Sequence, residues 1–232
     1  MKAGNIIRIA TIVLILGVLG FGVVAANKKT PNSEKVWDER MTMGSMDAEN
    51  YFVTYTDLMC PYCVAFEVAI LNNEDEFKQY LEENDVLFEV KLSDFLYEYG
   101  EARPINSRYS AEATLCARNE GRFWDYYKIA IATVWNNFFA TYGKSAFPMI
   151  NSLDKAFWID LGHQIGLSGD FDTCVNEDET LTEVIENARK TVDAANGGLP
   201  YFKFNKYELS GFDPSWDWSY VKKYFDMGLR NK

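Results

Sequence analysis

Histidine is almost missing from this chain, which has one, His163, among 232 residues. A lone histidine argues against a catalytic triad and against a metal site built on several histidines. The stretch WIDLGHQIGL around it has the pattern of a helix face, so we expect His163 to serve packing. Internal repeats and low-complexity tracts are also missing from the sequence, which excludes a repeat architecture.

Basic residues are scarce. From residue 28 onward the chain carries 21 lysines and arginines against 34 aspartates and glutamates. A surface with this excess of negative charge repels phosphate backbones, which argues against nucleic-acid binding. It also disfavours flat contact with anionic lipid, so we expect any membrane contact to come from an inserted segment alone.

Long apolar runs are missing too, with one exception near the N-terminus. Ile9–Ala26 contains Thr11 as its only polar residue and follows Lys2 and Arg8. As a helix this run would be about 27 Å long, close to the ~30 Å hydrocarbon layer of a bilayer. We therefore predict a transmembrane anchor in residues 1–26. A cleaved signal peptide is the alternative, because Val24-Ala25-Ala26 is similar to a cleavage site.

Two regions follow this segment. Residues 27–48 lack sustained periodicity and contain Pro31 and Gly44, which is typical of a linker. Residues 49–232 have the usual size of one domain. This domain opens with two predicted strands, Tyr51–Thr56 and Val86–Leu92, with predicted helix between them. This order predicts a parallel strand pair at the start of an α/β fold.

The middle of the domain is almost wholly helical in its pattern. The apolar spacing predicts helices near residues 63–71, 107–119, 122–137, 153–165 and 180–195. Two short strands are predicted next, Tyr201–Phe204 and Tyr207–Leu209, followed by a last helix, Trp216–Leu229. Strands on both sides of the helical block predict a helical subdomain, about residues 104–196, inserted into a small α/β sheet.

The chain has four cysteines: Cys60, Cys63, Cys116 and Cys174. A structural zinc site usually takes two closely spaced pairs of ligands, whereas Cys116 and Cys174 stand 58 positions apart, so we predict no metal. A purely structural bridge between Cys60 and Cys63 is a further alternative. It would stabilise the fold little, because so short a loop hardly restricts the unfolded chain.

A redox-active pair explains where Cys60 and Cys63 stand. The segment YTDLMCPYCVAFE leads from a predicted strand into a helix, which places Cys60 at the helix N-terminus. Unpaired backbone N–H groups and the helix dipole stabilise a thiolate there, and the thiolate is the species that attacks disulfides. Pro61 suits the first helical turn, where no N–H is needed. Cys60 would attack, and Cys63 would resolve the mixed disulfide.

The CPYC segment resembles the active site of the thioredoxin superfamily. The order of strand, CPYC helix, strand, helical insertion and Leu199-Pro200 before a strand is similar to that of the DsbA-like thiol–disulfide oxidoreductases. The segments ATLCARNEGRFWDYYKIA and GLSGDFDTCV also resemble parts of the insertion in that branch. The expected fold is therefore α/β: a thioredoxin fold with an inserted helical subdomain, preceded by one transmembrane helix.

The resemblance assigns roles to named positions. Cys60 and Cys63 match the reactive pair, and no cofactor is expected besides them. Pro200 matches a cis-proline that faces the pair and leaves the neighbouring backbone free to bind substrate as a strand. Leu199 matches the position before that proline, which tunes redox behaviour and contacts substrate.

Two positions depart from the family pattern. Pro61 and Tyr62 form the dipeptide between the cysteines, and the strongly oxidising DsbA enzymes carry Pro-His there, so Tyr62 implies a milder oxidant. Thr54 stands where relatives carry a buried acid that relays protons. Asp57 is nearby, but we expect it to be a solvated loop carboxylate.

The resemblance also implies a disulfide between Cys116 and Cys174 within the insertion. An oxidising compartment favours such a bond, and two buried free thiols are the alternative.

Taken together, the sequence predicts a membrane-tethered, extracytoplasmic, single-pass enzyme that introduces disulfides into exported cysteine-containing proteins through Cys60 and Cys63. The family implies a membrane redox partner of the DsbB or vitamin K epoxide reductase-like kind. A disulfide reductase or isomerase of the same fold is the first alternative, because the same CxxC architecture serves both directions of exchange. A tethered binding domain without turnover is the second.

Overall fold

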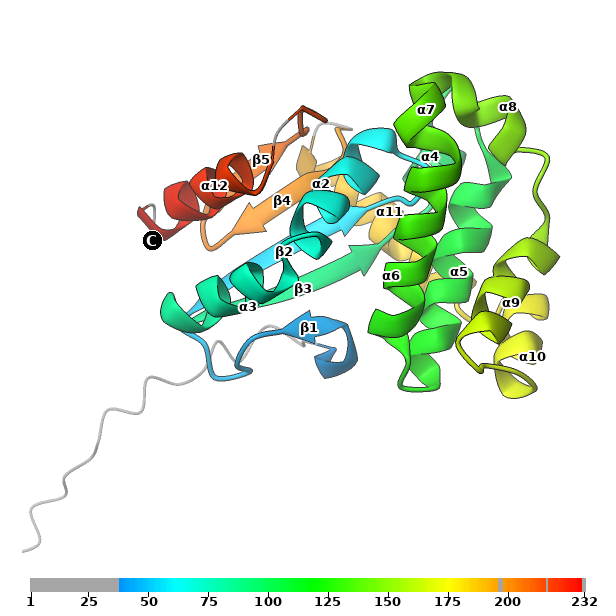
Figure 1. Ribbon diagram of the computed structural model, residues 1–232, viewed down its shortest axis with the longest axis horizontal. Coiled ribbons are helices and arrows are strands. Elements are labelled where there is room, and N and C mark those ends of the chain that lie inside the picture. Colours follow the sequence, from blue (N-terminus) through cyan, green and yellow to red (C-terminus); the bar gives the residue numbers. More distant parts are fainter. Residues whose placement is uncertain (1–37, 196–197, 216, 231–232) are drawn as a thin grey trace, which may run out of the picture. The chain divides into compact units, whose positions relative to one another are not determined.

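The computed structural model describes residues 38–195, 198–215 and 217–230 (Figure 1). The predicted anchor, residues 1–26, and the first part of the predicted linker lie outside these residues. Within the described ranges, no helix combines the length and apolar character needed to cross a bilayer.

A five-stranded mixed sheet forms the centre of the domain, with the strand order β1-β3-β2-β4-β5 (Figure 1). The strands β2 (Asn50–Thr56) and β3 (Val86–Leu92) are parallel, as predicted. The strand β4 (Tyr201–Phe204) runs antiparallel to β2, and β5 (Tyr207–Ser210) runs antiparallel to β4. Both predicted strand pairs are therefore confirmed, and the sheet joins residues from the two ends of the domain.

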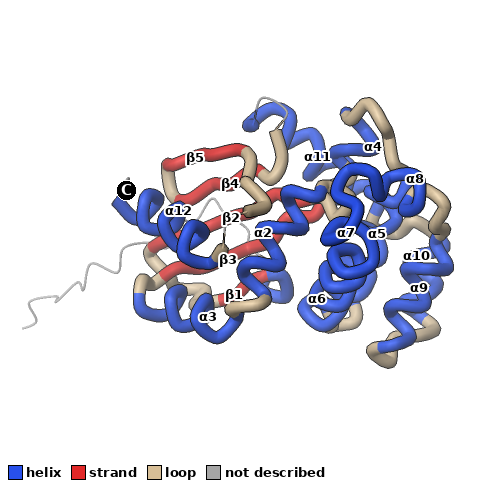
Figure 2. Tube along the Cα trace, turned by 45° about the horizontal axis from the view of Figure 1, so that its top comes forward, coloured by secondary structure: helices blue, strands red, loops and turns tan. Residues whose placement is uncertain are grey.

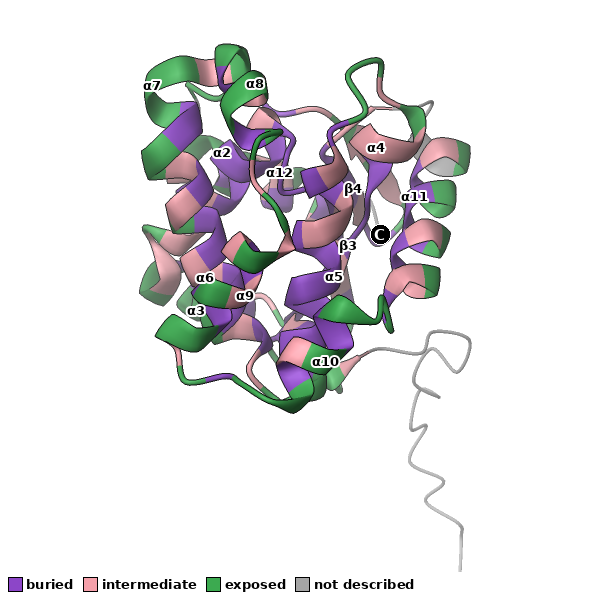
Figure 3. Ribbon diagram, turned by 90° about the vertical axis from the view of Figure 1, so that its right-hand side faces the viewer, coloured by how far each residue is buried: buried purple, intermediate pink, exposed green. Residues whose placement is uncertain are grey.

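Helices cover both faces of this sheet. The helices α2 (Pro61–Leu71) and α3 (Glu74–Glu83) connect β2 to β3 and share one face with α12 (Trp218–Arg230). On the other face lies α11 (Leu181–Ala195), as Figures 1 and 3 show from two directions. Because β2 and β3 are covered on both sides, they are buried along almost their whole length.

Stacked phenylalanine rings hold α2 and α12 on the sheet. Phe52 of β2 stands at the centre, with its ring centroid 4.1 Å from that of Phe225 and 5.7 Å from that of Phe88. Phe66 of α2 packs against Phe202 of β4 at 4.5 Å. Such pairs add to the stability that their buried area provides, so the strand that leads into the CPYC segment is firmly fixed.

The helical insertion runs from β3 to β4 (Figures 2 and 3). It contains α4 (Phe95–Tyr99), α5 (Ile105–Asn119), α6 (Phe123–Val134), the π-helical segment η2 (Trp135–Phe139), α7 (Ala140–Tyr142), the 3₁₀ turn η3 (Gly143–Ala146), α8 (Phe147–Ile150), α9 (Lys155–Gln164), α10 (Asp170–Asn176) and α11. The long helices match the predicted ranges. The short ones were not predicted, because one or two turns carry too little periodicity to identify them.

The predicted linker is shorter than expected. Residues Glu39–Met41 form a 3₁₀ turn, η1, and Thr42–Met43 form β1, which pairs antiparallel with β3. Met41 is fully buried and Met43 is nearly so. Two methionines in a short stretch thus cover the otherwise open edge of β3, and burial holds the stretch in place. This part of the linker prediction is wrong.

Candidate active site

Cys60 is the N-cap residue of α2. Its backbone is extended (φ −87°, ψ 110°), and Pro61 occupies the first helical turn. Its sulfur accepts a hydrogen bond from the Cys63 N–H at 3.4 Å, and its carbonyl accepts the first helical bond from Val64 at 3.0 Å. An N-cap side chain of this kind occupies the position where helix N–H groups stabilise negative charge. The Cys60 sulfur therefore faces the N–H groups of the first turn of α2.

Cys63 lies one turn further along α2 and is completely buried, whereas Cys60 is 5% exposed. Both are free thiols in the structure. Burial, followed by the hydrogen bond and the charge of the neighbouring Cys60 sulfur, raises the pKa of the Cys63 thiol well above its usual range. The two cysteines are therefore unequal: Cys60 retains a small exposed fraction, whereas Cys63 has none and is held neutral.

Pro200 lies at the same end of the sheet as this pair. The Leu199–Pro200 peptide bond is cis, and β4 begins at the next residue, Tyr201, opposite Tyr55 near the end of β2. Since the two strands are antiparallel, the residues just before β4 meet the loop that follows β2, which carries Cys60. Pro200 is buried and its carbonyl accepts a hydrogen bond from the Gly211 N–H at 2.8 Å, while Leu199 is half-buried.

Asp57 is not the solvated loop carboxylate that we expected. It is completely buried, and one carboxylate oxygen accepts the Met59 N–H at 2.8 Å. The other accepts the Leu96 N–H at 2.8 Å and the Ser107 hydroxyl at 2.5 Å. These three donors come from the active-site loop, α4 and α5, so the carboxylate joins three segments. Burial raises the pKa of Asp57 to about 6, and the three hydrogen bonds oppose that rise.

The Asp57 backbone also shapes the active-site loop, because its carbonyl accepts the Cys60 N–H at 2.9 Å. The prediction failed because the donors at Leu96 and Ser107 stand far along the chain. Only the folded insertion brings them to Asp57.

A second buried acid lies beneath the cysteines and was missed in the sequence. Glu67 is 1% exposed and stands four residues after Cys63, on the same face of α2. Burial raises the pKa of Glu67 to about 8, and the nearby Tyr127 hydroxyl partly offsets this rise. Within the described residues, neither Glu67 Oε1 nor the Tyr127 hydroxyl has a hydrogen-bond partner. The available signal was one glutamate inside the apolar run CVAFEVAIL.

Thr54, at the position where relatives carry an acid, is completely buried in β2. Its hydroxyl and that of Thr56 have no hydrogen-bond partner among the described residues. The buried acids near the cysteines of this chain therefore lie in the loop after the strand, at Asp57, and in the helix, at Glu67.

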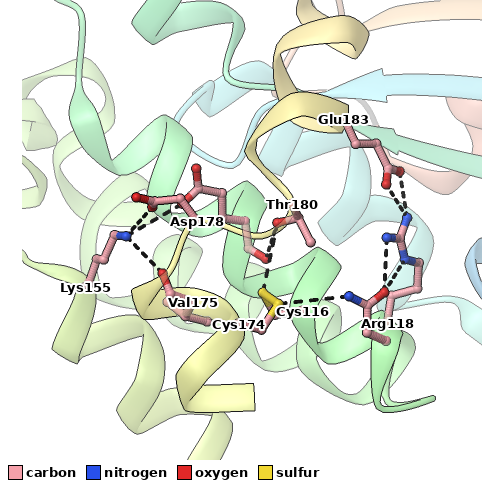
Figure 4. The surroundings of a disulfide bond; sticks show 10 residues. Cys116, Arg118, Lys155, Cys174, Val175, Asp178, Thr180 and Glu183 are labelled. Carbon is pink, nitrogen blue, oxygen red and sulfur yellow. Dashed lines mark hydrogen bonds and ion pairs between the residues drawn. A yellow bond between two sulfur atoms is a disulfide. The ribbon is translucent and has the colours of Figure 1, made fainter. Parts of the chain in front are cut away.

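The second cysteine pair lies in the insertion. Cys116 of α5 and Cys174 of α10 form a disulfide, with a sequence separation of 58 (Figure 4). Lys155 binds the end of α10 through the Val175 carbonyl at 2.9 Å and the turn after α10 through the Asp178 carboxylate. The bond thus ties two helices that are far apart in the sequence.

An ion pair and a further buried acid surround this disulfide. Arg118 pairs with Glu183 at 2.6 Å, so α11 is also joined to α5 (Figure 4). Glu112 of α5 is completely buried; burial, and then the neighbouring Asp178 carboxylate, raise its pKa to about 8.

Known proteins share the sequence pattern and the fold of this domain. A sequence profile of the thioredoxin family matches residues 37–208, whereas no curated protein matches the sequence. Among solved structures, alpha-DsbA1 from Wolbachia pipientis is similar with a TM-score of 0.58 at 12% identity, covering 82% of this chain and 91% of that chain.

Two other solved structures are similar at slightly higher identity. The catalytic domain of Proteus mirabilis ScsC gives a TM-score of 0.51 at 22% identity, with 83% of this chain and 91% of that chain covered. A periplasmic thioredoxin-like protein from Salmonella enterica serovar Typhimurium gives a TM-score of 0.55 at 17% identity, with 83% of this chain and 92% of that chain covered. At these identities the likeness concerns the fold. The profile match extends over most of the chain, and the chain belongs to the thioredoxin family and shares the fold of the DsbA-like proteins.

Proposed function

We propose that this protein is an extracytoplasmic thiol–disulfide oxidoreductase that introduces disulfides into exported proteins at Cys60 and Cys63. One arrangement carries the proposal: Cys60 caps α2, Cys63 is buried one turn below, and the cis Leu199–Pro200 bond lies at the same end of the sheet. A purely structural pair would need neither the N-cap position nor the adjacent cis-proline. Pro61 and Tyr62 complete the site as the residues between the cysteines.

The exchange proceeds in two steps. A substrate thiolate attacks the Cys60 sulfur of the oxidised pair; a substrate–Cys60 disulfide forms, the Cys60–Cys63 bond breaks, and Cys63 leaves and takes up a proton. A second substrate thiolate then attacks the substrate sulfur of this mixed disulfide, and Cys60 leaves as a thiolate. The substrate loses two electrons and two protons in all, and the protein gains the two electrons.

The raised pKa of Cys63 fits the second step, because a neutral Cys63 thiol attacks the mixed disulfide poorly and leaves it to the second substrate thiolate. The cis Leu199–Pro200 segment before β4 fits the binding of a substrate segment as an added strand, since a proline at position 200 leaves no N–H of its own to pair. Leu199 itself is half-buried and would border the substrate.

The proposed location rests on redox chemistry, and the proposed partner rests on the resemblance to the DsbA-like enzymes. A disulfide donor acts outside the reducing cytosol, the apolar run Ile9–Ala26 suits a single membrane anchor, and one of the similar structures is of a periplasmic protein. Each turnover leaves a dithiol, so an electron acceptor must restore the disulfide. We propose a membrane protein of the DsbB or vitamin K epoxide reductase-like kind for this step.

A disulfide reductase or isomerase is the second candidate, and Tyr62 favours it. A tyrosine in place of histidine supplies no charged contact to the Cys60 thiolate, and such contacts distinguish strong oxidants from reductants. The reduction potential separates the two. Thioredoxin has about −270 mV and DsbA about −120 mV, so a value near thioredoxin's would contradict the oxidase direction.

The test of the proposed activity uses the oxidised protein and a reduced, unfolded peptide with two cysteines. We expect the peptide to become oxidised with one disulfide formed per Cys60–Cys63 pair consumed. Cys60→Ser serves as the matched variant, and equal rates for the two proteins would reject the proposal.

A further inference from the structure

Tyr62, the residue inside the motif that departs from the strong oxidants, has a charged neighbour from the insertion. Lys144 Nζ lies 5.1 Å from the centroid of the Tyr62 ring, within the ~6 Å range over which an aromatic face attracts a cation. Lys144 belongs to η3, which follows the π-helical segment η2 and α7. Figures 1 and 2 both show α7 beside the first turns of α2, so the insertion brings this lysine to the active-site helix.

The charge of Lys144 is not neutralised. The side chain is exposed, and among the described residues no carboxylate pairs with it. Several other lysines of the domain are paired: Lys128 lies 2.6 Å from Glu74, and Lys203 lies 3.0 Å from Glu208. In a chain with net charge −11, an unpaired cation beside the active site is a specific feature.

We infer that Lys144 supplies the positive charge that the Pro-Tyr dipeptide lacks, and that it favours the Cys60 thiolate and substrates with acidic residues beside the target cysteine. The inference rests on the proposed function. Tyr62 stands two positions after Cys60, at the same start of α2, and its half-buried ring holds the ammonium there. Lys144 is a positioning residue for charge, not a catalytic residue.

Each effect has a direct physical cause. A cation near Cys60 stabilises the thiolate that is present only in the reduced protein, so it makes the pair a stronger oxidant. The same cation attracts an acidic residue and repels a basic one on the approaching substrate, and salt weakens both effects because the lysine is exposed.

The test compares Lys144→Met, which keeps the length of the side chain, with Lys144→Arg, which keeps the charge. Lys223→Met is the matched control, because Lys223 Nζ lies 4.2 Å over the Tyr220 ring on α12, outside the active-site elements. Two quantities are measured for each full-length protein. One is the redox equilibrium constant of the pair with glutathione. The other is the ratio of oxidation rates for two peptides that differ by Glu or Lys beside the cysteine.

At low salt we expect Lys144→Met to shift the equilibrium about threefold toward the oxidised protein and to lower the Glu/Lys rate ratio about fivefold. Lys144→Arg and Lys223→Met should stay near the wild type. An unchanged equilibrium and rate ratio in an active Lys144→Met protein would overturn the inference and leave the proposed function standing. An equal shift in Lys223→Met would also overturn it, because net charge alone would then explain the effect. A wild type without exchange activity would instead reject the proposed function.

Discussion

The two cysteine pairs of this protein are both buried, yet the structure uses them differently. Cys60 and Cys63 are three residues apart at the start of one helix, and they are free thiols. Cys116 and Cys174 join two helices across a sequence separation of 58. A bond in the first pair would restrict the unfolded chain little, whereas a bond in the second restricts it greatly. The first pair is thus suited to opening and closing, and the second to holding the insertion together.

Buried glutamates accompany both pairs. Glu67 lies below the first pair and Glu112 beside the second, and burial raises the pKa of each to about 8. A raised pKa near a cysteine therefore does not identify the reactive pair. Among the described residues, the helix N-cap at Cys60 and the cis Leu199–Pro200 bond at the same end of the sheet distinguish the first pair from the second.

The largest expected effect is on activity at the first pair. Cys60→Ser should lower the rate of thiol–disulfide exchange by at least about a thousandfold, since the serine hydroxyl does not replace a thiolate as nucleophile. The double variant Cys116→Ala/Cys174→Ala should keep exchange within about a few fold of the wild type. Rates with a reduced two-cysteine peptide test both, and a double variant as inactive as Cys60→Ser would remove the distinction between the pairs.

The next expected effect is on stability, and here the second pair should matter more than the first. Loss of the Cys116–Cys174 bond should lower the free energy of unfolding by about 4 kcal/mol, from the size of the loop that it closes. Reduction at Cys60–Cys63 should change it far less. Urea unfolding of the double variant and of Cys60→Ser measures both values, and an equal loss in the two proteins would contradict the assignment.

Glu67 should make stability depend on pH. Its pKa is about 8 in the folded protein and 4.5 in the unfolded chain, so the folded state holds the proton more tightly. Stability contributed by the neutral carboxyl is complete below about pH 4.5 and is lost as the pH rises to about 8. Glu67→Gln should therefore be more stable than the wild type at pH 8.5, by up to about 5 kcal/mol.

The exposed Glu120 provides the matched control for this effect. Urea unfolding of Glu67→Gln, Glu120→Gln and the wild type at pH 4 and pH 8.5 would measure it. A stability difference between Glu67→Gln and the wild type that is equal at both pH values would contradict the buried, neutral glutamate.

A smaller effect is expected at Asp57. Asp57→Ala leaves the Met59 and Leu96 N–H groups without their acceptor, and we expect a loss of about 2 kcal/mol in unfolding free energy. The active-site loop should loosen as well, so exchange should slow by about tenfold. Ser107→Ala removes one of the donors and should cost less in both measurements. Wild-type behaviour of Asp57→Ala would show that the loop keeps its shape without this carboxylate.

The first part of the domain could be predicted from sequence because its signals are local. The strand before Cys60, the proline after it and the apolar run behind Cys63 stand next to one another in the chain, and each matches the structure. The long helices of the insertion were predictable for the same reason, since they carry several turns of apolar periodicity.

The missed features depend on contacts between distant residues. Asp57 is buried because Leu96 and Ser107, 39 and 50 residues away, supply donors to it. The strand β1 exists because β3 offers it an edge, and Lys144 reaches Tyr62 only because the insertion folds back over α2. Local sequence patterns do not indicate such long-range contacts, because they form only when the tertiary structure packs.

The most direct test of the account is the trapping of a mixed disulfide with Cys63→Ala. Without the resolving thiol, a substrate that reacts with Cys60 cannot be displaced from within the protein. We predict that Cys63→Ala, exposed to a two-cysteine protein substrate in its oxidised form, accumulates a covalent adduct through Cys60 that dithiothreitol releases. Cys60→Ser/Cys63→Ala should form none. No adduct with Cys63→Ala, or an adduct that persists without Cys60, would contradict the assignment of the active site.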